Sequence, residues 1–155
     1  MALIDDLPDG ALVALDTMAF IYLTERSPKY HPIVRPIFEK LAAGLIEVHA
    51  SVVSLLEVLV LPISRGDSAL EQEYRELLTF SQLHLHPVDE SIAEAAAQIR
   101  AADLISGLRE DQAIRVGDSI VAATGLTSRC GYLVTNDRKL RRVAGIHVLL
   151  IDDYV

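Results

Sequence analysis

Short apolar runs alternate with longer amphipathic segments along this chain. The first run is continuously apolar and ends at Asp16, which is typical of a strand buried on both faces of a sheet. Five runs have the length and composition of strands, at residues 11–15, 46–50, 83–88, 132–135 and 147–151. Helical spacing or helix start signals lie between them, at residues 32–43, 54–63, 69–80, from 89 or 91 onward, 118–126 and briefly from 137.

Strands that alternate with helices predict the fold class. Each crossover is long enough to return a parallel strand, so we expect a three-layer α/β/α sandwich around a mostly parallel sheet of about five strands. Residues 1–155 have the size of one domain. The one stretch without clear periodicity, residues 105–117, is rich in charge and Gly, and we expect it to be a loop that leads into a helix opening at Asp118.

Composition restricts the class of protein. With 51% apolar and 23% charged residues, the profile is that of a globular chain and not a disordered one. The acidic N-terminus does not resemble a signal peptide, and no apolar run reaches the roughly 18 residues of a membrane span, so we expect a cytoplasmic protein without a membrane segment. The single cysteine, Cys130, cannot form an internal disulfide, and we expect it in the core.

The charge distribution bears on nucleic-acid binding. A net charge of −8 argues against it, because phosphate binding depends on Lys and Arg. Residues 100–142, however, hold eight of the 14 basic residues against five acids, which allows a basic rim around an acidic pocket. Four side chains are the candidate phosphate contacts of that rim: Arg109, Arg115, Arg138 and Lys139.

Four acids stand where ligand sites of parallel sheets form. Asp16 directly follows the first strand, and Asp137 follows the fourth strand after Asn136. Glu57 lies in the first turns of the helix after the second strand, and Asp118 is expected to open a helix before the fourth. Ligands of open parallel sheets bind at the carboxyl ends of strands, near the point where the strand order reverses. The four acids are therefore the candidate catalytic and metal-binding residues.

The apolar surroundings of these acids favour a bound cation. Glu57 has almost only apolar neighbours from 52 to 61, so a solvent-facing position is not expected. Taken singly, Asp118 and Asp137 can also be helix caps, and Asp16 an Asx turn. Four converging carboxylates repel one another, and oxygen ligands select Mg²⁺ or Mn²⁺ over zinc. Asp16 and Asp118 are the expected direct contacts, while Glu57 and Asp137 bind directly or through water.

The histidines are scattered and show no metal-ligand spacing. His84 and His86 share a face of one predicted strand, and this pattern favours a packing or sheet-edge role over a ligand pair. We therefore assign them no chemistry.

Four segments together resemble the PIN domain family, and in particular its VapC-like toxin ribonucleases. The segments are VALDTMAFIY (13–22), SVVSLLEV (51–58), GDSIVAAT (117–124) and LVTNDRKL (133–140). Each alone is a weak signal, but the ordered set covers nearly the whole chain. The resemblance departs at Met18, where relatives often have Asn or Ser, and at Gly117, where they often have a charged residue.

The resemblance implies an activity and partners. It implies an Mg²⁺- or Mn²⁺-dependent endoribonuclease that hydrolyses RNA phosphodiesters with a water activated by the ion, with Thr135 supporting the acids. It also implies the toxin component of a toxin–antitoxin system, a homodimer whose acidic pocket is blocked by an antitoxin segment carrying an Arg or similar cation. The helices between 51 and 80 are apolar enough to offer the antitoxin a surface.

The main alternative keeps the fold and drops the catalysis: a PIN-like module that binds RNA or a protein without cutting. The presence of all four acids argues against it. Other α/β classes fit poorly. A phosphoacceptor domain needs a basic residue after the fifth strand, a dehalogenase-type phosphatase needs an acid at Met18, and a nucleotide-binding fold needs a Gly-rich loop after Asp16.

Overall fold

A computed structural model describes residues 1–155 and contains all five predicted strands. The strands are β1 Leu12–Leu15, β2 Glu47–Ser51, β3 Leu83–His86, β4 Tyr132–Thr135 and β5 His147–Leu150. The α-helices are α1 Thr17–Thr24, α2 His31–Ala42, α3 Val52–Arg65, α4 Ser68–Leu78, α5 Glu90–Ile105 and α6 Val116–Thr127. Three short 3-10 helices complete the chain: η1 Leu3–Asp6, η2 Arg138–Arg142 and η3 Ile151–Tyr154.

The sheet is entirely parallel. Its strand order is β3-β2-β1-β4-β5, with Val13 paired to Val48 of β2 on one side and to Tyr132 of β4 on the other. Strands β2 and β3 lie on one side of β1, and the later strands β4 and β5 lie on the other. The order therefore reverses between β1 and β4, and ligand sites of open parallel sheets lie at the carboxyl ends of the strands beside such a point.

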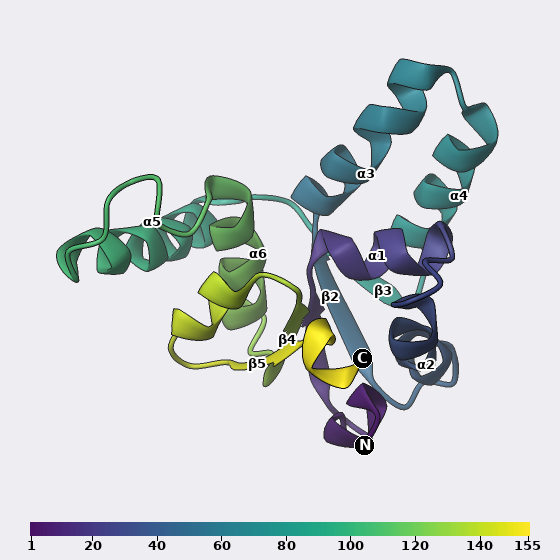
Figure 1. The fold of residues 1–155 in the computed structure, drawn as a ribbon, viewed down its shortest axis with the longest axis horizontal. Coiled ribbons are helices and arrows are strands. Elements are labelled where there is room, and N and C mark those ends of the chain that lie inside the picture. Colours follow the sequence, from purple (N-terminus) through teal and green to yellow (C-terminus); the bar gives the residue numbers. More distant parts are fainter.

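Helices cover both faces of the sheet, which confirms the predicted three-layer sandwich (Figure 1). Successive strand residues point to opposite faces. Val13 and Leu15 pack with α1 to α4 in the larger core, whereas Ala14 packs with α6 in a smaller one. Cys130 is buried in this smaller core, as expected.

The structure contains one α-helix that the hydrophobic pattern did not predict. Helix α1 begins directly after β1, with Asp16 as its N-cap, and its Ala19 and Phe20 are fully buried. Its sequence is apolar on nearly every side, so it shows no amphipathic period, and only packing against α2, α3 and α4 distinguishes it from a continued strand.

The start of α6 also differs from the prediction. The helix begins at Val116, two residues before Asp118, and the predicted loop is confined to the residues between α5 and α6. Buried Asp103 organises this loop, because its Oδ2 accepts hydrogen bonds from Ile114 N at 2.9 Å and from Arg142 Nη2 at 2.8 Å. The Asp103 carboxylate thus ties α5, the loop and η2 together just before α6.

Helix α3 starts at Val52 with Ser51 as its N-cap. It ends at Arg65, and the C-cap residue Gly66 adopts a left-handed conformation at φ 65°. Asp67 then caps α4 by accepting a hydrogen bond from Leu70 N. The two helices form a hairpin that projects from the rest of the molecule (Figure 1). No helix of the chain has the length and apolarity that crossing a membrane requires.

Close packing of α6 on β1 depends on Gly125. A Cβ at this position would lie 2.9 Å from Ala14 Cβ and 3.0 Å from Ile146 Cδ1. Gly125→Val therefore overpacks the smaller core, and we expect it to lower the free energy of unfolding by about 1–3 kcal/mol. Urea denaturation followed by circular dichroism measures the change. The control is Gly131→Val, which meets open space and should stay within about 0.5 kcal/mol of wild type; equal stability of the two variants would contradict this packing.

Candidate active site

Asp16 and Asp137 meet because β1 and β4 are neighbours. Leu15 pairs with Val134 in register, so the residues that follow the two strands emerge side by side at the carboxyl end of the sheet. This edge lies at the reversal of strand order, where the sequence places the candidate site.

Asp16 is the buried centre of the site, with 5% of its surface exposed. Its Oδ2 accepts a 2.6 Å hydrogen bond from Thr135 Oγ1, and its Oδ1 accepts a 2.7 Å hydrogen bond from Thr17 N. Burial raises the pKa of Asp16, and the charges of Glu57 and Asp137 act in the same direction, while the two hydrogen bonds oppose the rise. Thr135 therefore lies where a supporting residue was predicted.

Asp118 occupies the third position of α6, and the prediction that it opens or caps the helix is wrong. The N-cap is Arg115, whose side chain makes no capping hydrogen bond. The Asp118 carboxylate therefore does not cap the helix and is available to the site. Burial raises the pKa of Asp118 to about 7, with further contributions from the charge of Asp16, a hydrogen bond to Asp137 and the charges of Asp137 and Glu57. Burial and the neighbouring negative charges therefore both favour the protonated form of this carboxyl.

Asp137 caps a helix, as its sequence position allowed, and its side chain also lines the cavity. Its Oδ1 accepts a 3.0 Å hydrogen bond from Lys139 N and caps η2, while its own N–H donates to Thr135 Oγ1 at 3.0 Å. Thr135 thus links the two strand-end acids through one hydroxyl. Capping uses only one oxygen of Asp137, and the side chain still lines the same cavity as Asp16 and Asp118.

Glu57 reaches the site from α3, but it is exposed and not enclosed by apolar side chains as its sequence context predicted. The correction has a physical reason: this side of α3 faces away from the core, so the flanking Leu56 is exposed as well. Gly117 makes room for Glu57, because a Cβ there would lie 3.0 Å from Glu57 Oε1. The departure at Gly117 therefore allows α3 and α6 to approach at the site.

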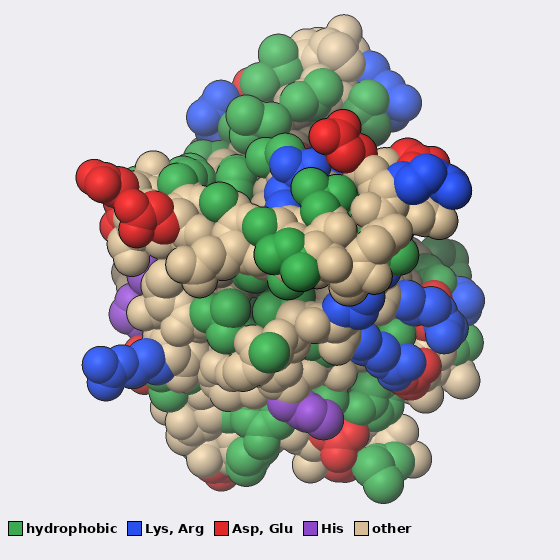
Figure 2. All heavy atoms as spheres, turned by 90° about the vertical axis from the view of Figure 1, so that its left-hand side faces the viewer, with side chains coloured by type: hydrophobic (Ala, Val, Ile, Leu, Met, Phe, Trp, Pro, Cys, Tyr) green, Lys and Arg blue, Asp and Glu red, His purple; other side chains and the backbone are tan.

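The four acids line one polar cavity of about 440 Å³. Of the four predicted phosphate contacts, Arg115 and Lys139 line it, while Arg109 and Arg138 do not. Arg109 instead pairs with Asp111 at 3.1 Å on the loop before α6. Figure 2 shows a group of Lys and Arg side chains on the right-hand side of the molecule, with others spread over the same face. The remaining lining residues, which the sequence analysis did not assign to the cavity, lie within three residues of the ends of β1 and β4: Thr17, Met18 and Asn136.

The donors of this cavity fit a hard divalent cation. They are carboxylate oxygens from four elements, and two of the carboxyls have raised pKa values that a nearby positive charge would lower. No three of the carboxylates place oxygens within 4.8 Å of one another, so the carboxylates are spread around the cavity and do not meet at one point. Such a spread suits Mg²⁺, which binds few protein ligands and keeps several waters.

Comparisons with known proteins agree with this fold. The chain is similar to one in the structure of VapBC2 from Rickettsia felis bound to a promoter DNA fragment, with TM-score 0.70, 18% identity and coverage of 90% of this chain and 98% of that one. It is also similar to a chain of FitAcB from Neisseria gonorrhoeae, with TM-score 0.64, 20% identity and coverage of 90% of this chain and 97% of that one. For VapBC-5 from Mycobacterium tuberculosis the TM-score is 0.58 and the identity 22%, with coverage of 92% of this chain and 99% of that one. No curated protein matches the sequence.

The family model described as PIN domain matches residues 13–146. This range runs from the second residue of β1 to the residue before β5, and it contains all four acids of the cavity. The chain belongs to the PIN domain family.

Proposed function

We propose that this protein is an Mg²⁺- or Mn²⁺-dependent endoribonuclease and the toxin component of a toxin–antitoxin pair that acts in the cytoplasm. One observation carries the proposal: Asp16, Glu57, Asp118 and Asp137, from four separate elements, line one open cavity together with two cationic side chains. The family match and the likeness to VapBC structures support the nuclease class and the toxin role.

The residues of the cavity have different proposed roles in phosphodiester hydrolysis. Asp16 and Asp118 would hold the ion directly, with Glu57 and Asp137 binding it directly or through water. When bound, the ion supplies an activated water and charge stabilisation for the leaving oxygen. Thr135 restrains Asp16 through its 2.6 Å hydrogen bond, which keeps the carboxylate in one orientation.

Substrate positioning falls to the cations of the cavity. Arg115 and Lys139 lie among the acids, where they can bind RNA phosphates that would otherwise be repelled by a protein of net charge −8. Arg109 and Arg138 would act farther along the RNA, since both are exposed and lie outside the cavity lining.

An apolar surface on α3 supports a protein partner. Leu56, Val60, Leu61 and Ile63 each expose 54–64% of their surface, and hydrophobic side chains gather at the projecting end of the molecule (Figure 2). Exposed apolar patches mark interaction sites. The VapBC-5 structure is described as a member of a family of toxin–antitoxin systems. We propose that an antitoxin covers this face and places an Arg or similar cation in the acidic cavity. A homodimer remains a prediction.

Replacing a direct ligand tests the catalytic role. Asp118→Asn should lower Mn²⁺-dependent cleavage of total RNA by about 100-fold or more, because the ion loses an anionic ligand. Cleavage rates with and without Mn²⁺ measure the effect, and expression of wild type, but not of the variant, should arrest growth.

Asp111→Asn is the matched control, since Asp111 lies on the exposed loop outside the cavity. Unchanged cleavage by Asp118→Asn would indicate a contaminating nuclease; a folded wild type that binds RNA without cutting it would favour the non-catalytic module.

The raised pKa of Asp118 predicts a pH dependence of stability. Its folded pKa of about 7 exceeds the usual 3.8, so the folded protein binds more protons than the unfolded chain between these values. The free energy of unfolding of the metal-free protein should therefore fall as pH rises through this window.

Urea denaturation in EDTA at about pH 5 and about pH 8 measures this fall. It should be shallower for Asp118→Asn, which should be more stable than wild type at the higher pH. Saturating Mg²⁺ should stabilise wild type more than the variant; identical pH profiles would contradict the raised pKa of Asp118.

Salt dependence tests the phosphate contacts. Replacing Arg115 and Lys139 together with Ala should weaken RNA binding and reduce the slope of log affinity against log salt by about 0.7 for each phosphate that is no longer neutralised. Fluorescence anisotropy in Ca²⁺, which allows binding without rapid cleavage, measures the slope. Arg109→Ala should change it less, because Arg109 is paired with Asp111. An unaltered slope in the double variant would exclude both residues from phosphate binding.

A further inference from the structure

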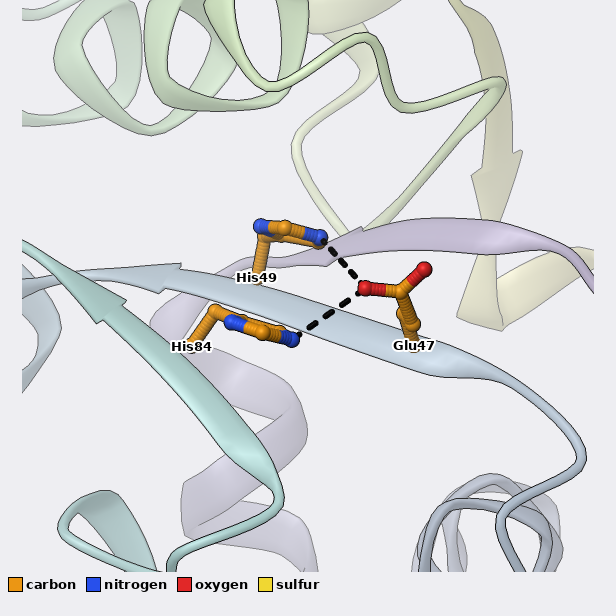
Figure 3. A group of neighbouring side chains, drawn as sticks. All are labelled: Glu47, His49 and His84. Carbon is orange, nitrogen blue, oxygen red and sulfur yellow. Dashed lines mark ion pairs between the residues drawn. The ribbon is translucent and has the colours of Figure 1, made fainter.

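A second group of ligand-type side chains lies on the sheet, away from the acidic cavity. Glu47 and His49 are two residues apart on β2, so both side chains lie on the face of the sheet that α6 covers. His84 of the edge strand β3 pairs in register with His49. Glu47 Oε1 lies 3.2 Å from His84 Nε2 and 3.9 Å from His49 Nε2 (Figure 3). This is the one set of three His, Cys, Asp or Glu side chains in the chain whose ligand atoms all lie within 4.8 Å of one another.

His49 supplies an independent observation. The residue is 7% exposed, and its Nε2 is the one buried side-chain nitrogen or oxygen in the protein without a hydrogen-bond partner. Its Nδ1 lies 2.8 Å from His86 Nε2. If Nδ1 carries the proton and donates to His86, then Nε2 holds a free lone pair directed toward Glu47. The opposite tautomer would leave a buried N–H without an acceptor, which costs free energy.

The surroundings of His49 match those of a metal-bound imidazole. Such a ligand commonly donates its second ring N–H to a neighbouring acceptor, which sets the tautomer and orients the ring. His86 provides this acceptor, and Ser128 Oγ lies 3.3 Å from the same His86 nitrogen. The contact of His49 Nδ1 with His86 thus fixes the ring, while His49 Nε2 has no hydrogen-bond partner.

We propose that Glu47, His49 and His84 form a binding site for a divalent transition-metal ion of the zinc type. Two imidazole nitrogens and one carboxylate oxygen are a ligand set that zinc accepts, with water in the fourth position. The donors differ from the oxygen-only acidic cavity, which favours Mg²⁺ or Mn²⁺. The bound ion would join β2 to β3 and so stabilise the exposed edge of the sheet.

Binding requires only local adjustment. Zinc binds such donors at about 2.0–2.2 Å, so tetrahedral ligand atoms lie roughly 3.3 Å apart, close to the 3.2 Å and 3.9 Å separations here. The His49 and His84 rings are stacked with centroids 4.6 Å apart, and an ion in the plane of both rings requires one to turn. The His84 and Glu47 side chains are 51% and 53% exposed and are free to do so. The sequence concealed the group because His84 lies far along the chain from Glu47 and His49.

Calorimetric titration with ZnCl₂ in excess Mg²⁺ tests the site, the Mg²⁺ serving to occupy the acidic cavity. We expect one zinc ion for each chain and at least about tenfold weaker binding in His84→Ala and in Glu47→Gln. Zinc at about 100 times its Kd should raise the Tm of wild type by about 5–10 °C, and should raise that of His84→Ala much less. Long-range ¹H–¹⁵N spectra should show zinc-induced shifts at Nε2 of His49 and His84.

Three controls make the result specific. His147→Ala removes an exposed histidine from the opposite edge strand, β5, and should bind zinc like wild type. Asp118→Asn and Cys130→Ser should also retain wild-type affinity, because they alter the acidic cavity and the buried thiol. Wild-type zinc affinity in both His84→Ala and Glu47→Gln would overturn the proposal. Loss of binding in Asp118→Asn or Cys130→Ser, with His84→Ala unaffected, would likewise overturn it and assign the ion elsewhere.

Discussion

Repulsion among carboxylates held at one end of the sheet is the constraint on which the rest of this structure depends. Asp16 is buried, and burial together with neighbouring charges raises the pKa values of Asp16 and Asp118. Hydrogen bonds from Thr135 and Thr17 offset part of the cost at Asp16 but leave Asp118 without a comparable donor. A carboxylate cluster of this kind is stable when a cation or protons neutralise it, which connects folding free energy to metal binding.

The scaffold maintains that cluster by using separate elements for each acid. Parallel pairing of β1 with β4 places two of them side by side, and α3 and α6 bring the others from opposite layers of the sandwich. The Asp103 carboxylate fixes the loop before α6 through Ile114 and Arg142, so the helix that carries Asp118 starts from an anchored position. Rigid elements of this kind can hold groups together that would separate on a flexible chain.

Two regions of one sheet thus differ in chemistry. Oxygen donors meet beyond the carboxyl ends of β1 and β4, whereas imidazole nitrogens gather on β2 and the edge strand β3. The two donor types favour different cations, so the two proposed sites would not compete for the same ion. The exposed apolar face of α3 is a third surface, and it adjoins the acidic cavity through Glu57.

Local pattern by itself determined the five strands and the layered parallel architecture, and it singled out the four candidate acids, because apolar runs and the positions that follow them are properties of short segments. Tertiary structure alone decided the rest. Helix α1 has no amphipathic period, Glu57 faces solvent despite its apolar neighbours, and only Arg115 and Lys139 of four predicted cations reach the cavity. The pairing of His49 with His84 depends on which strands are adjacent. These features follow from contacts between distant segments, and no spacing along the chain encodes them.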